Sequence, residues 1–406
     1  MGPAGQLNDP AGAARSKPAL VANLVAQLGF GLLAMMICLP SMQDWPAEFG
    51  ASQPAVQLTF SAFALAFGGM QLVYGAVSDR IGRKPVLVFG LLLAMAGSLA
   101  AALSDSLGLL VAARFVQGAG SAAGMVIARA MVQDLFAGPE RVRVMALIGM
   151  SMGVCPPLAT LVGGQLHVRV GWQANFVLIA ALAAGLLVSA WRGLPPGRGG
   201  QGEASLAQLL GGYVRLAREP AFRLYVVLLA SLTAAFYAFL AGTPLVLKSY
   251  GVTPENVGWT IASIPLAYVF GNLLTTRLAR THSERFIMGW GQVATIGGIL
   301  LVLALGLAGV RSPYALALPL LLLGIGHGLL VPPTLAGAIG VIPALAGSAA
   351  AVGGLGQQVL GALGGFMVGL VPHEGQVNLA LMMLMWSVLG LVVQLWLHRT
   401  LRRGAA

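Results

Sequence analysis

The sequence predicts an all-α membrane protein in which twelve transmembrane helices form two pseudo-symmetric six-helix bundles. Of its 406 residues, 58% are hydrophobic and 9% are charged, whereas a soluble domain carries about 25% charged residues. Apolar runs that reach the roughly 20 residues needed to cross a bilayer occur twelve times along the chain. A stretch rich in Pro, Gly and Arg at residues 195–220 separates the first six runs from the last six.

The ends of each run are marked by charged, Gly or Pro residues, which bound the predicted helices. These helices cover residues 19–42, 54–77, 86–104, 108–134, 142–166, 172–194, 221–247, 254–276, 285–309, 312–340, 346–370 and 376–398. The chain then divides into an N-terminal tail, a first bundle, a linker, a second bundle and a C-terminal tail at residues 1–18, 19–194, 195–220, 221–398 and 399–406. Within the linker, Leu206 to Leu216 is expected to form an amphipathic piece.

The distribution of cations predicts the orientation in the membrane. With the N-terminus inside, eighteen of the 23 Lys and Arg residues lie on the cytoplasmic side, three lie outside (Arg169, Lys248 and Arg311) and two lie within a helix (Arg114 and Arg129). Cytoplasmic loops of membrane proteins carry the excess of Lys and Arg. We therefore expect both termini on the cytoplasmic side of a bacterial-type inner membrane, with the first helix as the insertion signal.

A compact charged block lies between the second and third predicted helices. Its candidate functional residues are Gly75, Asp79, Arg80, Gly82 and Arg83. We expect a short cytoplasmic turn here, in which Gly82 permits a sharp reversal and Asp79 caps the N-terminus of a neighbouring helix. An ordinary topogenic loop needs only cations, so the glycines and the aspartate favour a specific role over that alternative.

The pattern G-x-x-x-D-R-x-G-R-K in this block resembles the signature loop of the major facilitator superfamily of transporters. Arg114 begins R-x-x-Q-G-x-G and Arg129 begins R-A-x-x-x-D in the predicted fourth helix. Both patterns resemble the bicyclomycin-resistance type of drug efflux pump within that superfamily. The resemblance implies the superfamily fold and efflux of drug-like molecules.

The same resemblance implies a latch between the two halves on the cytoplasmic side. By this likeness Asp79 would cap the start of helix eleven near Ser348, and Arg83 would pair with Asp134. Both contacts are expected in the outward-facing state.

Arg114, Gln117 and Ser121 recur at i, i+3 and i+7, which places them on one face of the predicted fourth helix. An arginine in a membrane-spanning segment is costly and is a functional candidate by default. We expect this polar stripe to line a substrate cavity. In the alternative interpretation, Arg114 lies about two turns from the helix end and its side chain reaches the membrane interface.

The predicted fifth helix carries small residues and two prolines at Gly153, Pro156, Pro157, Gly163 and Gly164. It resembles an antiporter motif that ends G-P-x-x-G-G, although Ala159-Thr160 stands where that motif has Gly-Pro. Either proline removes a helical hydrogen bond and can bend the helix. Small residues also permit tight helix packing, and the two interpretations are compatible.

Further candidates for the cavity are isolated polar or soft side chains within apolar runs. They are Asn23, Gln27, Met36, Tyr237, Tyr268, His327, Gln357 and Gln358. Met36 stands where the resembling pumps carry an acid, so the usual proton-carrying carboxylate is missing. Asp134 and His327 remain as candidates for proton coupling, and His327 is favoured because imidazole titrates near neutral pH. Uncoupled or potential-driven transport of cationic drugs is the alternative.

Composition and resemblance together predict a secondary transporter that exports hydrophobic or amphipathic drug-like compounds, with proton antiport as the coupling. A carrier for a single metabolite such as an amino acid or sugar derivative, and a non-transporting membrane sensor, are the alternatives. No phosphate-binding loop, metal-ligand cluster or nucleophile-base pattern occurs, so we expect no enzyme activity, no cofactor and no metal. The cations form no basic tract that would indicate nucleic acid, and we expect a monomer in the lipid bilayer.

Overall fold

A computed structural model describes residues 10–195 and 206–403, and every regular element in these ranges is a helix. Twelve of the helical segments are long and apolar enough to cross a membrane, and each overlaps one predicted span, so the twelve-helix prediction is confirmed. The helices of the first half, with the short η1, are α1 (Pro10–Met36), η1 (Leu39–Gln43), α2 (Trp45–Glu48), α3 (Gln53–Ile81), α4 (Arg83–Ala102), α5 (Leu107–Leu135), α6 (Gly138–Arg169) and α7 (Gln173–Gly193). Those that follow are α8 (Leu206–Arg218), α9 (Pro220–Ser249), α10 (Pro254–Leu278), α11 (Glu284–Leu307), α12 (Pro313–Gly340), η2 (Pro343–Leu345), α13 (Ala346–Val368) and α14 (Gln376–Arg403).

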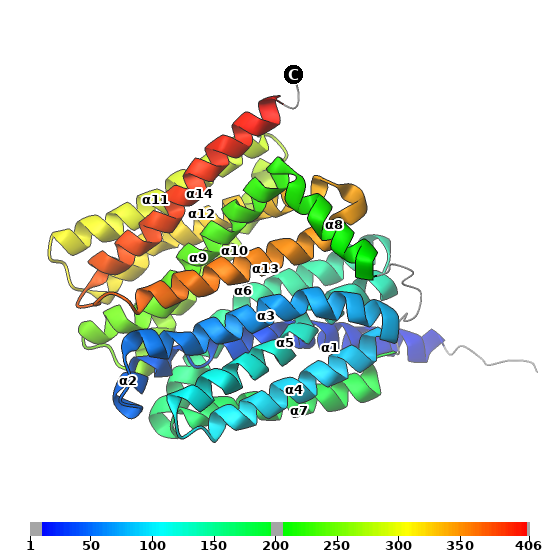
Figure 1. Cartoon of the computed structure of the whole chain (residues 1–406), viewed down its shortest axis with the longest axis horizontal. Coiled ribbons are helices and arrows are strands. Elements are labelled where there is room, and N and C mark those ends of the chain that lie inside the picture. Colours follow the sequence, from blue (N-terminus) through cyan, green and yellow to red (C-terminus); the bar gives the residue numbers. More distant parts are fainter. Residues whose placement is uncertain (1–9, 196–205, 404–406) are drawn as a thin grey trace, which may run out of the picture.

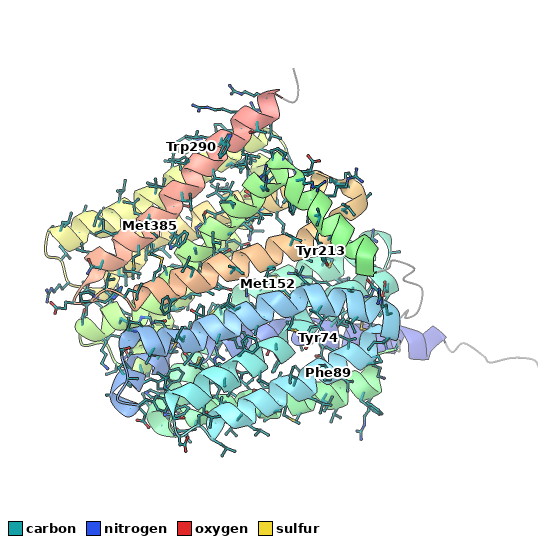
Figure 2. The ribbon with its side chains drawn as sticks, viewed as in Figure 1. Tyr74, Phe89, Met152, Tyr213, Trp290 and Met385 are labelled. Atoms are coloured by element: carbon teal, nitrogen blue, oxygen red, sulfur yellow. The ribbon has the colours of Figure 1, made fainter. Side chains whose placement is uncertain are left out.

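The helices form two groups that lie side by side, one from α1 to α7 and the other from α9 to α14, with α8 at the right of Figure 1. Glycines let helices within a group approach closely: a β-carbon on Gly97 of α4 would lie 2.7 Å from the α-carbon of Gln117 in α5. In a bilayer such close packing replaces the hydrophobic drive that holds soluble helices together. Side chains project all around both groups (Figure 2), as expected for a protein whose outer surface faces lipid.

The molecule has two ends, which we name the terminal face and the distal face. The terminal face contains the α3–α4 turn, α8 and the last turn of α14, whereas the distal face contains η1, α2 and the α9–α10 turn. At the distal face Trp45 packs edge-on against Trp172 with ring centroids 5.7 Å apart and stacks on Phe176 at 6.4 Å. This aromatic cluster ties the segment after α1 to α7.

Two pairs of helices join the halves, and both make their contacts toward the distal face. Between α3 and α13, a β-carbon on Gly369 would lie 2.7 Å from Pro54, and Ser61 donates a hydrogen bond of 2.8 Å to the Ala362 carbonyl. Between α6 and α10, a β-carbon on Gly258 would lie 2.9 Å from the backbone of Leu161. These are contacts at backbone distance, so they admit no larger side chain.

The glycine contacts between α3 and α13 end partway toward the terminal face. The glycine contact nearest that face joins Gly354 to the side chain of Gln71. Nearer that face, Gly75 on α3 and Gly347 and Gly353 on α13 have no atom within 4 Å of the position of a β-carbon, although Gly353 is itself buried. We call the open space at these β-carbon positions the inter-half gap.

The charged block at residues 75–85 differs from the turn that the sequence predicts. Asp79 and Arg80 belong to the last turn of α3, and Arg83 already begins α4. Only Gly82 leaves the helical conformation, with a φ of +101° that side chains with a β-carbon rarely adopt. One glycine is thus enough for the reversal between α3 and α4, because its positive φ changes the chain direction within a single residue.

Candidate functional site

Arg114 is enclosed within the first half. Its side chain is fully buried, and its guanidinium donates hydrogen bonds to the carbonyls of Ala34 and Met35 at 2.8 and 3.1 Å and to Gln117 Oε1 at 2.6 Å. These two carbonyls lie in the last turn of α1, where a helix has acceptors without intrahelical donors. The guanidinium also stacks over the ring of Phe63 at 4.4 Å. In this conformation Arg114 caps α1, and its lining of a cavity stays a prediction.

The rest of the predicted polar stripe is buried beside Arg114. Gln117 donates from Nε2 to Ser98 Oγ at 2.8 Å, and Ser121 donates to the Gln117 carbonyl at 2.7 Å. Met36 is buried in the same region. The face that carries Arg114, Gln117 and Ser121 therefore packs against other helices of the first half.

Gln27 and Asn23 fasten α1 to α7. Gln27 Nε2 donates to Asn23 Oδ1 and to the Leu186 carbonyl, both at 3.1 Å, and Asn23 Nδ2 donates to the Ser189 carbonyl at 3.0 Å. Both side chains are buried. They contact α7 and do not reach the other half in this conformation.

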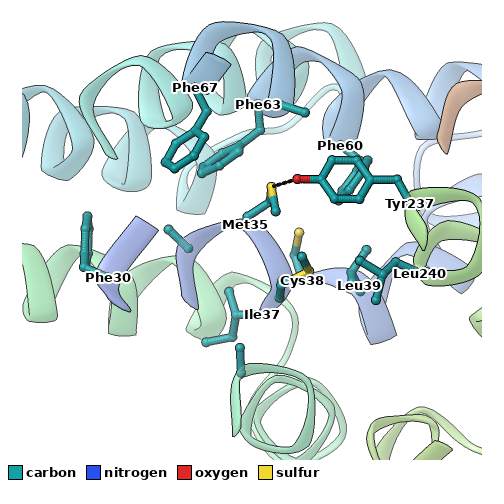
Figure 3. Packing of buried hydrophobic residues seen from close by; sticks show 14 of the residues in the cluster. Phe30, Met35, Ile37, Cys38, Leu39, Phe60, Phe63, Phe67, Tyr237 and Leu240 are labelled. Atoms are coloured by element: carbon teal, nitrogen blue, oxygen red, sulfur yellow. Dashed lines mark hydrogen bonds between the residues drawn. The ribbon is translucent and has the colours of Figure 1, made fainter. Parts of the chain in front are cut away.

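Tyr237 lies where the two halves meet (Figure 3). Its hydroxyl contacts Gln358 Oε1 at 2.7 Å within the second half and Met35 Sδ at 3.6 Å in the first half. Its ring packs edge-on against Phe60 of α3 with centroids 5.1 Å apart. A single phenol therefore joins α9, α13, α1 and α3. Gln357, next to Gln358, is half-buried and donates to Thr233 Oγ1 at 3.2 Å.

His327 and Tyr268 occupy the second half. His327 is 5% exposed, its ring lies 6.4 Å from that of Phe236, and its Nε2 is a buried atom without a hydrogen-bond partner among the described residues. Tyr268 on α10 is half-buried. An imidazole nitrogen that is buried and unpartnered is the type of group that a proton or a substrate donor could satisfy.

Arg83 joins three helices of the first half at the terminal face. Its Nη1 bonds Asp79 and, at 2.8 Å, Ser78 Oγ, and its Nε donates to Asp134 Oδ2 at 3.1 Å. The Arg83–Asp134 pair thus forms, but both residues belong to the first half. Ser348 lies across the gap, where a β-carbon on Gly212 of α8 would be 3.9 Å from its hydroxyl.

The motif residues of the fifth spanning helix lie in α6, which contacts the second half. A β-carbon on Gly164 would lie 3.1 Å from the α-carbon of Glu255, and one on Gly153 would overlap Val269. Gly163 faces the backbone of Ile37 at the end of α1. Pro156 and Pro157 lie inside the helix, where Thr160 Oγ1 bonds their carbonyls at 3.2 and 3.1 Å.

Sequence reasoning missed a charged cluster at the distal face that also joins the halves. Lys248 of α9 donates to Asp44 Oδ1 at 2.8 Å and to the Gln43 carbonyl at 2.7 Å, and His167 of α6 lies 3.0 Å from Asp44 Oδ2. Partial burial raises the pKa of Asp44, but hydrogen bonds from Lys248 and His167 outweigh that effect and lower it. A pocket of about 450 Å³ opens beside Lys248 between the halves. The signal in the sequence was the placement of Asp44 and Lys248 at the ends of two spans.

The comparisons with known proteins decide the family. Residues 19–365 match the model of the Major Facilitator Superfamily. The chain belongs to the Major Facilitator Superfamily. It is 32% identical over 386 residues to multidrug resistance protein D of Escherichia coli (strain K12), with 93% of this chain and 95% of that protein covered. It is 28% identical over 363 residues to a chloramphenicol resistance protein of Pseudomonas aeruginosa, with 87% and 85% covered.

Solved structures agree with the Major Facilitator Superfamily fold. A bacterial homolog of the human lysosomal transporter Spinster, in an inward-facing and unoccupied conformation, superposes with a TM-score of 0.73 at 14% identity, covering 94% of this chain and 96% of that chain. The peptide transporter POT gives 0.73 at 15% identity, covering 96% and 94%. The predicted fold and the resemblance to drug-efflux members are confirmed, and the chain is a multi-pass membrane protein of a family of transporters.

Proposed function

We propose that this transporter exports hydrophobic or amphipathic drug-like compounds across a bacterial inner membrane by alternating access. The observation that carries the proposal is the arrangement of the halves, which pack at backbone distance toward the distal face, where Gly369 meets Pro54 and Gly258 meets Leu161. Two bundles that meet at one end can rock about that contact and expose a shared site to each side in turn. The names of the relatives supply the substrate class.

The terminal face is the cytoplasmic face in this proposal. It holds the start of α1, the end of α14 and the Arg80–Lys84 cluster, and eighteen of the 23 Lys and Arg residues lie on this side of the predicted spans. Cations of short loops remain in the cytoplasm. In this proposal the inter-half gap opens to the cytoplasm and admits substrate from that side. The pump works as a monomer.

The register of α3 and α13 supports a role for Asp79 in closing this face. Gln71 and Gly354 are in contact across the two halves. Asp79 lies eight residues beyond Gln71, and Ala346, the first residue of α13, lies eight residues before Gly354. If the two helices close in the same register, the Asp79 carboxylate reaches the N-terminus of α13 beside Ser348, where backbone N–H groups favour an anion.

Proton antiport is the proposed coupling, with His327 as the carrier. Its buried Nε2 lacks a hydrogen-bond partner among the described residues, whereas Asp134 is held by Arg83 at 3.1 Å. A group that exchanges protons during each cycle must not be committed to a permanent ion pair. Asp134 is the competing carrier.

The test of export is the susceptibility of a pump-deficient bacterial host to a broad panel of compounds. Expression of the wild type should raise the inhibitory concentration of several hydrophobic compounds at least four-fold, whereas a control that carries Tyr237→Trp at the inter-half contact should give no protection at equal membrane level. A host that remains equally sensitive to every compound would contradict the proposal.

Coupling is tested separately in inverted vesicles by substrate-induced proton release. Release is expected for the wild type and for Asp134→Asn, and its loss is expected for His327→Ala and His327→Gln. Release that persists in both His327 variants excludes His327 as the carrier, and an absence of release in the wild type excludes antiport.

A further inference from the structure

The membrane interior of this chain contains cations and no carboxylate beyond the helix ends. Arg114 and Arg129 both lie at least one full turn inside α5. The Asp and Glu residues of the spanning helices all lie in a first or last turn, namely Asp79, Asp134, Glu140, Glu255 and Glu284. A charge in a bilayer interior is costly unless it is paired or functional, so each arginine requires an explanation.

The burial of Arg114 is explained, because its guanidinium caps α1 and bonds Gln117. The position of Arg129 has no such explanation. Its Nη2 contacts the Met152 sulfur at 3.4 Å, and a thioether is only a weak acceptor. No carboxylate pairs with Arg129 in the ranges that the structure describes. Five N–H donors on a half-buried guanidinium are thus left with one weak protein acceptor.

Arg129 contacts α6 one residue before the position at which α6 meets the second half. Its Nη2 bonds Met152, and the next residue, Gly153, lies against Val269 of α10. The helical side chain leans toward the N-terminus of its own helix, which for α5 lies at the distal face. The guanidinium is therefore directed away from the terminal face.

The polar side chains that flank Val269 on α10, and Gln357 on α13, are neutral. Gln357 and Tyr268 are half-buried, and Asn272 is half-buried with an Oδ1 that lacks a hydrogen-bond partner. Asp134, five residues from Arg129 and about 7–8 Å along the helix axis, is already bonded to Arg83. Nothing among these groups neutralises the charge of Arg129.

We infer that Arg129 is an anion-binding subsite, so that among amphipathic compounds this transporter selects those with a carboxylate, sulfonate or phosphate head group. A planar guanidinium presents paired N–H donors that match the two oxygens of such a group. The apolar body of the compound then lies against the apolar walls of the gap, and a cationic head group is disfavoured by like-charge repulsion. The inference rests on the proposed export function and adds the sign of the charge that it prefers.

The test compares three fluorescent probes that share a naphthalene body and differ only in the head group: sulfonate, hydroxymethyl and trimethylammonium. Binding is measured by fluorescence to the full chain in nanodiscs of zwitterionic lipid. The wild type should bind the sulfonate at least ten-fold more tightly than the trimethylammonium probe. Arg129→Gln should lose this preference while binding of the neutral probe changes less than two-fold, and Arg129→Lys should keep part of the preference. Arg141→Gln removes the same charge from an exposed position at the start of α6 and should change nothing.

The outcomes separate this inference from the proposed function. Equal binding of the three probes by the wild type, or a preference for the cation, overturns the anion subsite and leaves export intact. A preference for sulfonate that survives in Arg129→Gln also overturns it. Failure of every probe to bind, together with unchanged drug susceptibility of the host, removes the export function and the subsite with it. The wild-type series needs no variant, so a misfolded Arg129→Gln does not prevent the test.

A lipid head group carries the same anionic chemistry, and one further arm distinguishes it. The sulfonate measurement is repeated in nanodiscs that contain an anionic phospholipid. Unchanged sulfonate affinity supports a subsite for an exported solute. A loss of ten-fold or more overturns that assignment, because it shows that the phospholipid occupies the guanidinium.

Discussion

Lys248 donates a hydrogen bond of 2.8 Å to Asp44, which lies 204 residues earlier in the chain and in the other half of the molecule. The pair closes the distal face together with the backbone contacts of α3 with α13 and α6 with α10. Both side chains are about half exposed, at 50% and 42%. A pair of this exposure contributes about 0.2–1 kcal/mol, enough to bias a conformational equilibrium without fixing it.

Asp44→Asn and Lys248→Gln should each increase the population that is open at the distal face by a factor of roughly 1.5–5, which corresponds to the loss of such a pair. Spin labels at Ala47→Cys and Glu374→Cys, in a background with Cys38→Ala and Cys155→Ser, report this population as a longer distance in double electron–electron resonance. Arg311→Gln serves as the control, because it removes a cation from the same face without an ion pair to Asp44. Identical distance distributions in all four proteins would show that the pair does not bias the equilibrium.

The same distances should depend on pH in one direction. The lowered pKa of Asp44 lies below 3.8, so its contribution is fully present above about 3.8 and is lost as the pH falls through the lowered pKa. The titration of Asp44 should leave the distance distributions unchanged at neutral and weakly acid pH. The distal-open population should increase as the pH falls below 3.8, and this increase should be absent from Asp44→Asn. Equal responses of both proteins in this acid range would assign the change to other groups.

Arg83→Lys should impair transport nearly as much as Arg83→Ala. A lysine ammonium cannot reproduce the geometry in which one guanidinium bonds Asp79, Asp134 and Ser78 together. In a double-mutant cycle with Asp134→Asn, the combined effect on the initial transport rate should be smaller than the product of the single effects, because both changes break one contact. Fully multiplicative effects would indicate that the residues act independently. Protein level in the membrane is the control.

Arg114→Ala should destabilise the fold by about 2–4 kcal/mol, since it leaves the carbonyls of Ala34 and Met35 and the amide of Gln117 without a donor in the membrane interior. The measurement is thermal unfolding in detergent. Arg114→Lys should recover part of this lost stability. Arg141→Gln, the control, should leave the stability unchanged. A melting curve for Arg114→Ala that matches the wild type would mean that water replaces the guanidinium, which would favour the cavity interpretation.

A disulfide between Gly75→Cys and Ala350→Cys should form only when the terminal face closes. Gly75 lies four residues beyond Gln71, and Ala350 lies four residues before Gly354, so the register of α3 and α13 places them opposite each other. Crosslinking should increase in the presence of substrate and should stop transport until a reductant is added. Transport that continues with the crosslink in place would refute rocking about the distal contact.

The fold could be predicted from the sequence because it depends on local quantities. Each span is an uninterrupted apolar run, and its length sets where it enters and leaves the bilayer. The turn at Gly82 was located correctly, although the helix continues through Asp79 and Arg80, because hydropathy marks where charge begins and not where helical hydrogen bonding ends.

The site was less accessible to this reasoning. Periodicity placed Arg114, Gln117 and Ser121 on one face, but it does not say which helix covers that face, and in the structure the last turn of α1 does. The positions of Asp44 and Lys248 at the ends of two spans are visible in the sequence, but their pairing depends on how these distant helix ends meet. Arg129 stood out by its position in a span, yet its lack of an acidic partner is visible only in three dimensions.

Gly75 and Gly353 have no atom within 4 Å of the position of a β-carbon in the conformation described here, although each lies inside a helix and Gly353 is buried. A glycine in a helix interior costs about 1 kcal/mol relative to alanine, so at both positions this conformation carries a loss of helix stability without a contact to offset it. Gly68, on the same helix as Gly75, already receives the side chain of Gln358. If the terminal face closes in the same register, the two glycines become contact positions as well. Alanine at Gly353 would then strengthen α13 and at the same time oppose closure of the terminal face, so that thermal stability and turnover rate move in opposite directions.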